Sequence, residues 1–245
     1  MSSLSQKKYR DKEGCFIAEG TKCVLDTWGY FKCKMLISSQ NWYDTFGNQE
    51  HLDILHIASR QQLLKMSQFT NPSEVIAVYE IPEDKIDAKD IDNKLNIILD
   101  GIQDPGNLGT IIRLADWYGI RNIFCSKQTV DVYNHKVVQA TMGAISRVKV
   151  HYCDLKNLIN DYPNMPVYGT TLDGENIYTA NLSDFGFVIF GNEGNGMTSQ
   201  LKAMTTGNLF IPSRNIDGET SESLNVGLAA AITISEFCRN QLKCK

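Results

Sequence analysis

The chain has 245 residues, of which 42% are hydrophobic and 21% charged, and its formal net charge is −4. This composition is typical of a soluble globular protein. No stretch approaches the roughly 18 apolar residues of a membrane span, and the first 30 residues lack an apolar signal region. The seven cysteines are scattered without a C-x-x-C pair, which argues against a disulfide framework or a zinc site and indicates a cytoplasmic protein.

Charge is distributed unevenly along the chain. Residues 1–34 contain seven basic and four acidic residues, whereas the remainder contains 17 basic and 24 acidic residues. A basic segment on an acidic body can contact phosphate locally, although a solvated terminus explains the same charges. The charge pattern alone leaves both interpretations open.

Short apolar runs alternate with helical patterns in the first eighty residues. "CFIAEG", "KMLIS", "LDILHIA" and "EVIAVYE" predict strands, and a helix is expected to begin near Thr21. Ser59 is placed to cap a helix over "RQQLLKMSQF". We therefore predict a small α/β domain over residues 1–80. The segment "EIPEDKIDAKDIDNK" holds six acids and three lysines, and it predicts a linker over residues 81–94.

The alternation is stronger in the second predicted domain, residues 95–245. Its continuous apolar runs of strand length are "LNIILDGI" (95–102), "RNIFCS" (121–126), "PVYGTTL" (166–172), "FGFVIFG" (185–191) and "NLFIPS" (208–213). Runs without period-two alternation are typical of strands buried on both faces, so we expect a parallel sheet covered by helices. The last segment, "SLNVGLAAAITISEFCRN", predicts a long helix.

Ligands of open α/β sheets bind beyond the carboxyl ends of the strands, and the first loop of this kind is "DPGNLGTIIR". Pro105 and Gly106 predict a turn, and Asn107 is a candidate N-cap of the following helix. Arg113 lies among apolar residues, where a buried arginine needs a partner. Phosphate and carboxylate both suit it, and a structural ion pair explains it equally well.

The second loop is "FGNEGNGMT", residues 190–198, which contains Gly191, Gly194 and Gly196. It is a near miss to the dinucleotide-binding fingerprint, and it lacks the lysine of a Walker-type phosphate loop. Its glycines would let backbone amides approach a ligand, although a structural tight turn explains them equally well. Glu193 could hold a cation or anchor the arginine.

The third loop belongs to "IPSRNIDGETSESLNVGLAAAI", residues 211–232. Ser223 suits the N-cap of the last helix. Asn225, two residues further on, is not explained by capping. The four histidines lie outside all three loops, and neither a serine or cysteine nucleophile system nor a zinc motif is present in the sequence. The expected chemistry is positioning and polarisation, without a covalent intermediate or a metal ion.

Taken in order, the three loops resemble the three signature motifs of the SpoU (TrmH-type) RNA ribose methyltransferases of the SPOUT superfamily. "DPGNLGTIIRLADWYGI" resembles the first motif, "GNEGNGM" the second, and the 211–232 segment the third, while "VVQATMGAISRVKV" resembles the segment between the first two. The similarity covers roughly residues 95–240. The N-terminal region, including "KKYRDKEGCFIAEGTKCVLD", resembles the ribosomal-protein-like substrate-binding domain of many such enzymes.

The resemblance implies a SPOUT-type parallel α/β sheet whose C-terminal region forms a deep trefoil knot, preceded by the small α/β substrate-binding domain. It implies a homodimer that binds S-adenosylmethionine inside the knot and transfers its methyl group to a ribose 2′-hydroxyl of RNA. Ribosomal RNA of the large subunit (23S) is favoured over transfer RNA. Neither a metal ion nor a membrane is expected as a partner.

The resemblance also assigns residues to the cofactor. They lie at the ends of strands and in the loops that follow: Thr170, Leu172, Gly191, Asn192, Gly194, Gly196, Ile211 and Leu224. The loop between Pro212 and Ser223 is longer and more charged than the usual short Gly/Ser-rich loop of the family. We therefore assign no cofactor contact from Ser213 to Glu222.

Arg113 matches the family arginine assigned to deprotonation of the ribose hydroxyl. Since arginine stays protonated in proteins, we expect it to hold the phosphate beside the target ribose and to stabilise the developing charge. Asn107 would orient that arginine or the ribose, Glu193 would pair with Arg113 or Asn107, and Ser223 and Asn225 would complete the cleft. The residues expected to contact RNA are Lys7, Lys8, Arg10, Lys22 and Arg113.

The alternative functions are a nucleotide-dependent oxidoreductase, a non-catalytic RNA-binding module and a base methyltransferase. A nucleotide-dependent oxidoreductase would have its fingerprint after the first strand, where this chain has "DPGNLG". The joint presence of five candidate catalytic residues argues against a non-catalytic RNA-binding module. The Ser-Leu-Asn of the third motif favours ribose methylation over base methylation, and transfer RNA remains an alternative substrate.

Overall fold

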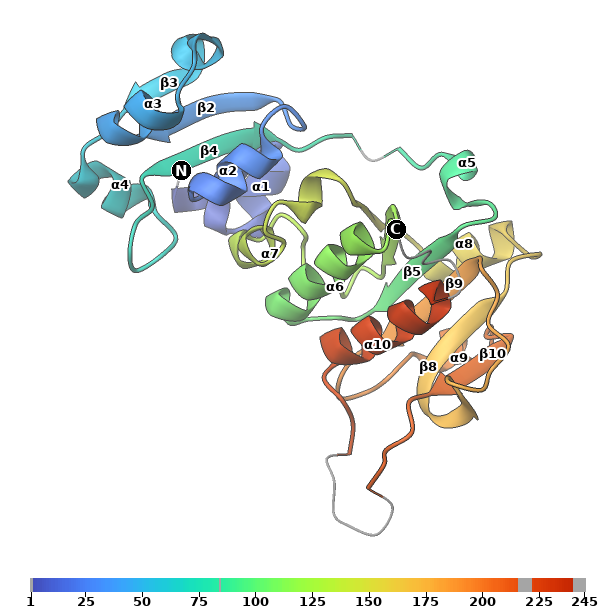
Figure 1. The fold of residues 1–245 in the computed structure, drawn as a ribbon. Helices are drawn as coiled ribbons and strands as arrows, with labels where there is room; N and C mark the ends of the chain where they lie inside the picture. Colours follow the sequence, from blue (N-terminus) through green and yellow to red (C-terminus); the bar gives the residue numbers. More distant parts are fainter. Residues whose placement is uncertain (1, 84, 216–221, 240–245) are drawn as a thin grey trace. The chain divides into compact units, whose positions relative to one another are not determined.

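Two β-sheets organise the chain, one built from residues 15–80 and the other from residues 95–210 (Figure 1). The computed structural model describes residues 2–83, 85–215 and 222–239. Contacts between Cα atoms group residues 1–84 and 131–146 into a first unit, and residues 85–130 and 147–245 into a second. The first unit is therefore assembled from two separate stretches of sequence.

The first unit contains a four-stranded sheet in the order β1-β4-β2-β3, in which only β2 and β3 pair parallel. Its strands are β1 (Cys15–Glu19), β2 (Cys33–Ser38), β3 (Leu55–Ile57) and β4 (Val75–Glu80). Its helices are α1 (Lys7–Glu13), α2 (Thr21–Thr27), α3 (Gln40–Phe46), α4 (Arg60–Met66) and α7 (His135–Ala140), with 3-10 turns at Ser2–Ser5, Gln49–Ile54 and Ala144–Ser146. All four strands predicted before residue 81 are confirmed.

Local sequence signals explain where these elements begin. Ser59 caps α4 as predicted, and it does so as a capping box, in which the Gln62 side chain accepts a hydrogen bond from the Ser59 backbone N–H. β1 and β4 are buried along almost their whole length, because helices cover the sheet. Their apolar runs, which do not alternate with polar residues, are typical of such buried strands. Their side chains pack with Leu4, Ile37 and Leu63 into the core of the unit.

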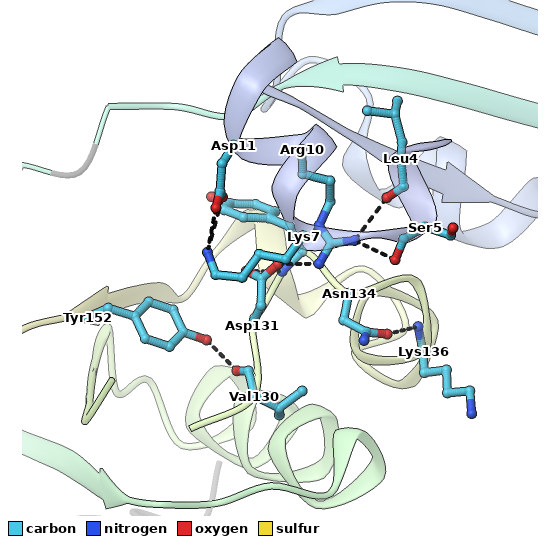
Figure 2. A network of polar contacts seen from close by, with 11 residues as sticks. Leu4, Ser5, Lys7, Arg10, Asp11, Val130, Asp131, Asn134, Lys136 and Tyr152 are labelled. Carbon is cyan, nitrogen blue, oxygen red and sulfur yellow. Dashed lines mark hydrogen bonds and ion pairs between the residues drawn. The ribbon is translucent and has the colours of Figure 1, made fainter. Parts of the chain in front are cut away.

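Several contacts join residues 131–146 to the rest of the first unit. The guanidinium of Arg10 donates two hydrogen bonds to one carboxylate oxygen of Asp131 (Figure 2). The rings of Phe16 and Tyr133 lie 4.7 Å apart. Gly143, with a φ of +86°, lies against Asp26 so closely that an added Cβ would come within 2.3 Å of the Asp26 Cβ. Only glycine fits there, because it alone lacks the clashing atom and adopts that φ freely.

The second unit contains a six-stranded parallel sheet in the order β10-β8-β9-β5-β6-β7. Its strands are β5 (Leu95–Asp100), β6 (Asn122–Cys125), β7 (Lys149–Tyr152), β8 (Val167–Asn176), β9 (Gly186–Gly191) and β10 (Gly207–Phe210). Its helices are α5 (Ala88–Ile91), α6 (Pro105–Trp117), α8 (Leu155–Asp161), α9 (Ser199–Lys202) and α10 (Val226–Cys238). The parallel sheet and all five predicted strands are confirmed.

β7 was not predicted, and its place in the sheet gives the reason. It is an edge strand that pairs only with β6, and its sequence KVHY alternates between charged or polar and apolar residues. β8 also extends beyond the predicted end at Leu172 to Asn176, with an irregularity where its pairing partner passes from Asn208 to Leu209.

None of the helices in the described residues is long and apolar enough to cross a membrane.

Candidate active site

The candidate site lies where the strand order of the second sheet switches direction. From β5 the chain proceeds outward through β6 and β7, whereas the later strand β9 pairs with the other edge of β5. Asp100 and Gly191, the last residues of β5 and β9, are aligned partners, so the loops after both strands start side by side. Such a switch point is where open α/β sheets bind their ligands.

Two hydrogen bonds hold these loops together. The Asn192 Nδ2 donates to the Gly101 carbonyl over 2.9 Å, and the Thr198 backbone N–H donates to the Asp100 Oδ2 over 2.7 Å. The second loop closes on itself, because Asn192 and Gly196 exchange backbone hydrogen bonds of 3.0 and 2.8 Å. Neither Asp100 nor Thr198 was among the predicted site residues. These hydrogen bonds fix the conformation of the second loop without a bound ligand.

Helix α6 begins three residues earlier than predicted. Asp104 is the N-cap, and its Oδ1 accepts a 2.8 Å hydrogen bond from the Asn107 backbone N–H. Pro105 takes the first helical position, where its lack of an N–H costs nothing. The prediction that Asn107 is the N-cap is therefore wrong. As the third residue of the helix, Asn107 has its side chain available for contacts with the other loops.

The Asn107 side chain joins the second and third loops. Its Nδ2 donates to the Glu193 Oε1 over 2.5 Å, and its Oδ1 accepts from the Asn225 Nδ2 over 3.0 Å. Of the two partners expected for Glu193, Arg113 and Asn107, the structure has Asn107. We call Asn107, Glu193 and Asn225 the polar cluster. It unites three segments that lie 86 and 118 residues apart in the sequence.

Asn225 also explains how α10 begins. Its Oδ1 accepts hydrogen bonds from the backbone N–H groups of Gly227 and Leu228, which makes it the N-cap of α10. The sequence interpretation placed the cap at Ser223, and this is wrong by two residues. Ser223 is exposed and lies before the helix. One amide side chain therefore performs two tasks, since its oxygen caps α10 while its nitrogen holds Asn107.

Arg113 lies on α6 with an exposed side chain, so the expectation that it is buried among apolar neighbours is wrong. The apolar neighbours Ile111 and Ile112 face the core, whereas Arg113 occupies the opposite, solvent-facing side of the helix. Among the residues that the structure describes, its guanidinium has no ion-pair or hydrogen-bond partner. An exposed guanidinium that no carboxylate occupies is available to an RNA phosphate.

The glycines of the second loop differ in their constraints. A Cβ at Gly191 would lie 2.3 Å from the Gly196 carbonyl carbon and from the Met197 nitrogen, so the backbone needs a glycine there. Gly196 has a φ of +67°, whereas Gly194 meets nothing closer than the Asn192 Oδ1 at 3.5 Å. The backbone therefore favours glycine at the two ends of the loop, Gly191 and Gly196, and does not require it at Gly194.

The other predicted cofactor residues occupy neighbouring strand ends. Thr170 in β8 donates its hydroxyl to the Ile189 carbonyl of β9 over 2.9 Å, which ties those two strands together. Leu172 and Leu224 are 75% and 46% exposed, and Ile211 follows β10 directly. Exposed leucines and the exposed residues 193–196 are the kinds of group that the adenosine part of S-adenosylmethionine needs, namely apolar walls and backbone hydrogen bonds. Residues 216–221 of the third loop lie outside the described residues.

The predicted RNA-contact residues of the first unit divide into two kinds. Lys7, Lys8 and Lys22 have exposed side chains, and Lys7 and Lys22 form surface ion pairs with Asp11 and Asp26. Such pairs are weak and can exchange for phosphate. The assignment of Arg10 needs correction, because its side chain is only 3% exposed and is fully engaged inside the unit (Figure 2).

No group of three or more potential metal-ligating side chains occurs in the described part of the chain.

The fold defines an α/β protein with a parallel sheet, and its candidate site at the switch point is built from polar side chains of three loops. The chain belongs to the SpoU rRNA Methylase family, whose model matches residues 94–235. A second model, the MRM3-like substrate binding domain, matches residues 1–77. An oxidoreductase is thereby set aside.

The similarity to individual relatives extends over nearly the whole chain. The 23S rRNA (guanosine(2553)-2′-O)-methyltransferase RlmP of Bacillus subtilis (strain 168) is 30% identical over 237 residues, which cover 94% of this chain and 91% of that protein. A TrmH-family protein from Porphyromonas gingivalis is 35% identical, with a TM-score of 0.86 over 97% of this chain and 95% of that one. The AdoMet-bound rRNA methyltransferase from Sinorhizobium meliloti is 27% identical, with a TM-score of 0.84 over 98% and 93%.

Proposed function

We propose that this chain methylates a ribose 2′-hydroxyl of large-subunit ribosomal RNA. The chain is an S-adenosylmethionine-dependent RNA methyltransferase, as its family and its relatives establish. RlmP is named for 2′-O-methylation of a guanosine in 23S rRNA, and it supports the same RNA class and the same acceptor atom here. The observation that carries the proposal is the polar cluster, which brings three separate motifs together on the helix that bears the exposed Arg113.

The polar cluster and Arg113 divide the catalytic work. Bound S-adenosylmethionine supplies an electrophilic methyl group. The ribose hydroxyl is a poor nucleophile that must lose its proton as it attacks. Arg113 holds the phosphate beside the target ribose and stabilises the negative charge that develops on the oxygen. Asn107, held between Glu193 and Asn225, keeps a fixed orientation toward the ribose, and Ser223 adds a hydroxyl at the start of the third segment.

The proposed cofactor seat lies at the ends of β8, β9 and β10. Its members are Thr170, Leu172, Gly191, Asn192, Gly194, Gly196, Ile211 and Leu224. The exposed leucines are suited to cover the adenine faces, and the loop after β9 offers backbone groups to its edge. The trefoil knot that the family resemblance implies is part of the same proposal, and the packing of the C-terminal helix α10 on α6 and β9 supports it.

The first unit is the proposed RNA-binding domain. The match to the MRM3-like substrate binding domain supports residues 1–80 in this role, joined through the linker 81–94 to the methyltransferase domain 95–245. Residues 131–146 are an exception, because they fold with the first unit. Lys7, Lys8 and Lys22 are its proposed phosphate contacts. We also propose a homodimer, as the family resemblance implies, with the exposed Leu228 of α10 as a candidate contact. The free thiols of the six cysteines in the described residues support a reducing cytoplasm.

The experiment that tests the proposed function has two parts. Ribosomal RNA from cells lacking this protein is mapped for ribose methylation by mass spectrometry, and the purified protein is then incubated with that RNA and S-adenosylmethionine. One 2′-O-methyl group in 23S rRNA should be absent from the cells and restored in the test tube. Restoration in transfer RNA instead would select the alternative substrate, and methylation on a base would contradict ribose chemistry.

Variants separate the two proposed sites. Arg113→Ala should abolish transfer and leave the Kd for S-adenosylmethionine unchanged, whereas loss of cofactor binding would contradict the role given to Arg113. Lys7→Gln, Lys8→Gln and Lys22→Gln together should weaken RNA binding and reduce its salt dependence by about three charges. Lys65→Gln, an exposed change on α4, is the control. Substitutions are preferable to removal of residues 1–94, which would take away the partners of segment 131–146.

A further inference from the structure

Trp117, the last residue of α6, has an unusual environment for an indole. Its side chain is 84% exposed, more than any other large hydrophobic residue among those described. Trp42, by comparison, is 1% exposed. An indole left in water forgoes the burial that stabilises most tryptophans, so its position on the helix of Asn107 and Arg113 calls for a ligand.

Trp117 and Arg113 share one face of α6. They are four residues apart, which places them within about 40° of each other around the axis and about 6 Å apart along it. Both side chains are exposed. The helix therefore presents a guanidinium and a flat aromatic ring side by side, and the polar cluster lies at the other end of the same helix.

The charges around the indole favour a polyanion. The carboxylate of Asp116 is engaged by Arg147, whose Nε and Nη2 donate hydrogen bonds of 2.9 and 2.8 Å to its two oxygens. The neighbouring acid is thus neutralised, while the exposed Arg113 lies about one turn before Trp117 on the same helix. A free guanidinium beside a neutralised carboxylate, together with an exposed aromatic ring, suits a phosphate backbone that carries bases.

We propose that Trp117 is a stacking platform for an unpaired base of the RNA substrate, next to the nucleotide whose phosphate Arg113 holds. This rests on the proposed function. Aromatic side chains bind single-stranded RNA by stacking on bases, while nearby cations hold the backbone. Trp117 is then a substrate-binding residue that selects targets with an unstacked base beside the methylated ribose.

The test uses the full-length protein and 23S rRNA transcribed in vitro, which lacks all modifications. Trp117→Ala should weaken RNA binding, or raise the KM for this RNA, by about tenfold or more, since base stacking on an aromatic ring contributes that much. Trp117→Phe should stay close to the wild type, because it keeps a ring. The Kd for S-adenosylmethionine should be unchanged in both variants. Ile86→Ala, which removes an exposed apolar side chain outside α6, is the matched control.

Fluorescence gives a readout that does not depend on methyl transfer. The transcript should quench tryptophan emission of the wild type, and Trp117→Phe should lose most of that quenching. Unchanged RNA affinity in Trp117→Ala would overturn the proposal. So would a loss of affinity that coincides with dissociation of a dimer in sedimentation, because Trp117 would then cover a second copy. A wild type that shows the quenching but no transfer to any RNA would contradict the proposed function alone.

Discussion

Arg10 and Asp131 form a buried ion pair between residues 121 positions apart in the sequence. The Nε and Nη2 of Arg10 donate hydrogen bonds of 3.0 and 2.5 Å to the same carboxylate oxygen, and the Nη1 donates to the carbonyls of Leu4 and Ser5 (Figure 2). The two side chains are 3% and 15% exposed. The pair fixes residues 131–146 to the first helix of the chain.

Breaking this pair should destabilise the first unit. Arg10→Met leaves the Asp131 carboxylate and two carbonyls without their partner, so we expect the free energy of unfolding to fall by about 3 kcal/mol. Chemical denaturation followed by circular dichroism measures this. Lys7→Ala, which removes an exposed ion pair from the same helix, should cost less than about 1 kcal/mol. Equal effects of both substitutions would contradict the buried character of the Arg10 pair.

Two glycines of the loop after β9 should respond differently to alanine. Gly191→Ala places a Cβ 2.3 Å from backbone atoms of Gly196 and Met197, so the loop must open and the affinity for S-adenosylmethionine should fall at least about tenfold. Gly194→Ala has 3.5 Å to its nearest neighbour, so it should leave the loop backbone in place and lower the affinity less than Gly191→Ala does. Isothermal titration calorimetry compares the two. Normal binding by Gly191→Ala would remove this loop from the cofactor seat.

The two tasks of Asn225 can be separated. Asn225→Asp keeps the oxygen that caps α10 and removes the Nδ2 donor to Asn107, so stability should be nearly unchanged while kcat falls by about a hundredfold. Asn225→Ala should lose the cap as well, at a cost of about 1 kcal/mol. Denaturation curves and single-turnover methyl transfer provide the measurements. If the aspartate variant keeps full kcat, the orientation of Asn107 does not govern the reaction.

The first unit should lose stability in mild acid. His135 begins α7, and burial, followed by the charges of Lys136 and Arg10, lowers its pKa below the usual 6.5, while Glu19 acts in the opposite direction. The unfolded state therefore binds a proton more readily, so this contribution to stability is complete above pH 6.5 and is lost as the pH falls toward the lowered value. His135→Gln should reduce the loss between about pH 8 and about pH 5.5. An identical pH dependence in both proteins would refute it.

The sequence predicted every strand except β7, and it predicted Asn107 as one of two partners of Glu193, because apolar runs and motif order are local or family-wide signals. Helix starts were misplaced where two residues compete for a cap. Asp104 before Pro105 is the better signal for α6, since proline favours the first helical position. The burial of Arg10 was not predictable, because its partner Asp131 comes from a distant part of the chain.

The division of the first unit into two stretches governs how such chains can be recombined. Its polypeptide passes between the units at 84–85, 130–131 and 146–147. A chimera that takes the first unit from a relative must therefore take both segments, 1–84 and 131–146, from the same parent. If only residues 1–84 were exchanged, residue 26 of one parent would face residue 143 of the other. In this chain Asp26 leaves no room for a methyl group added at Gly143.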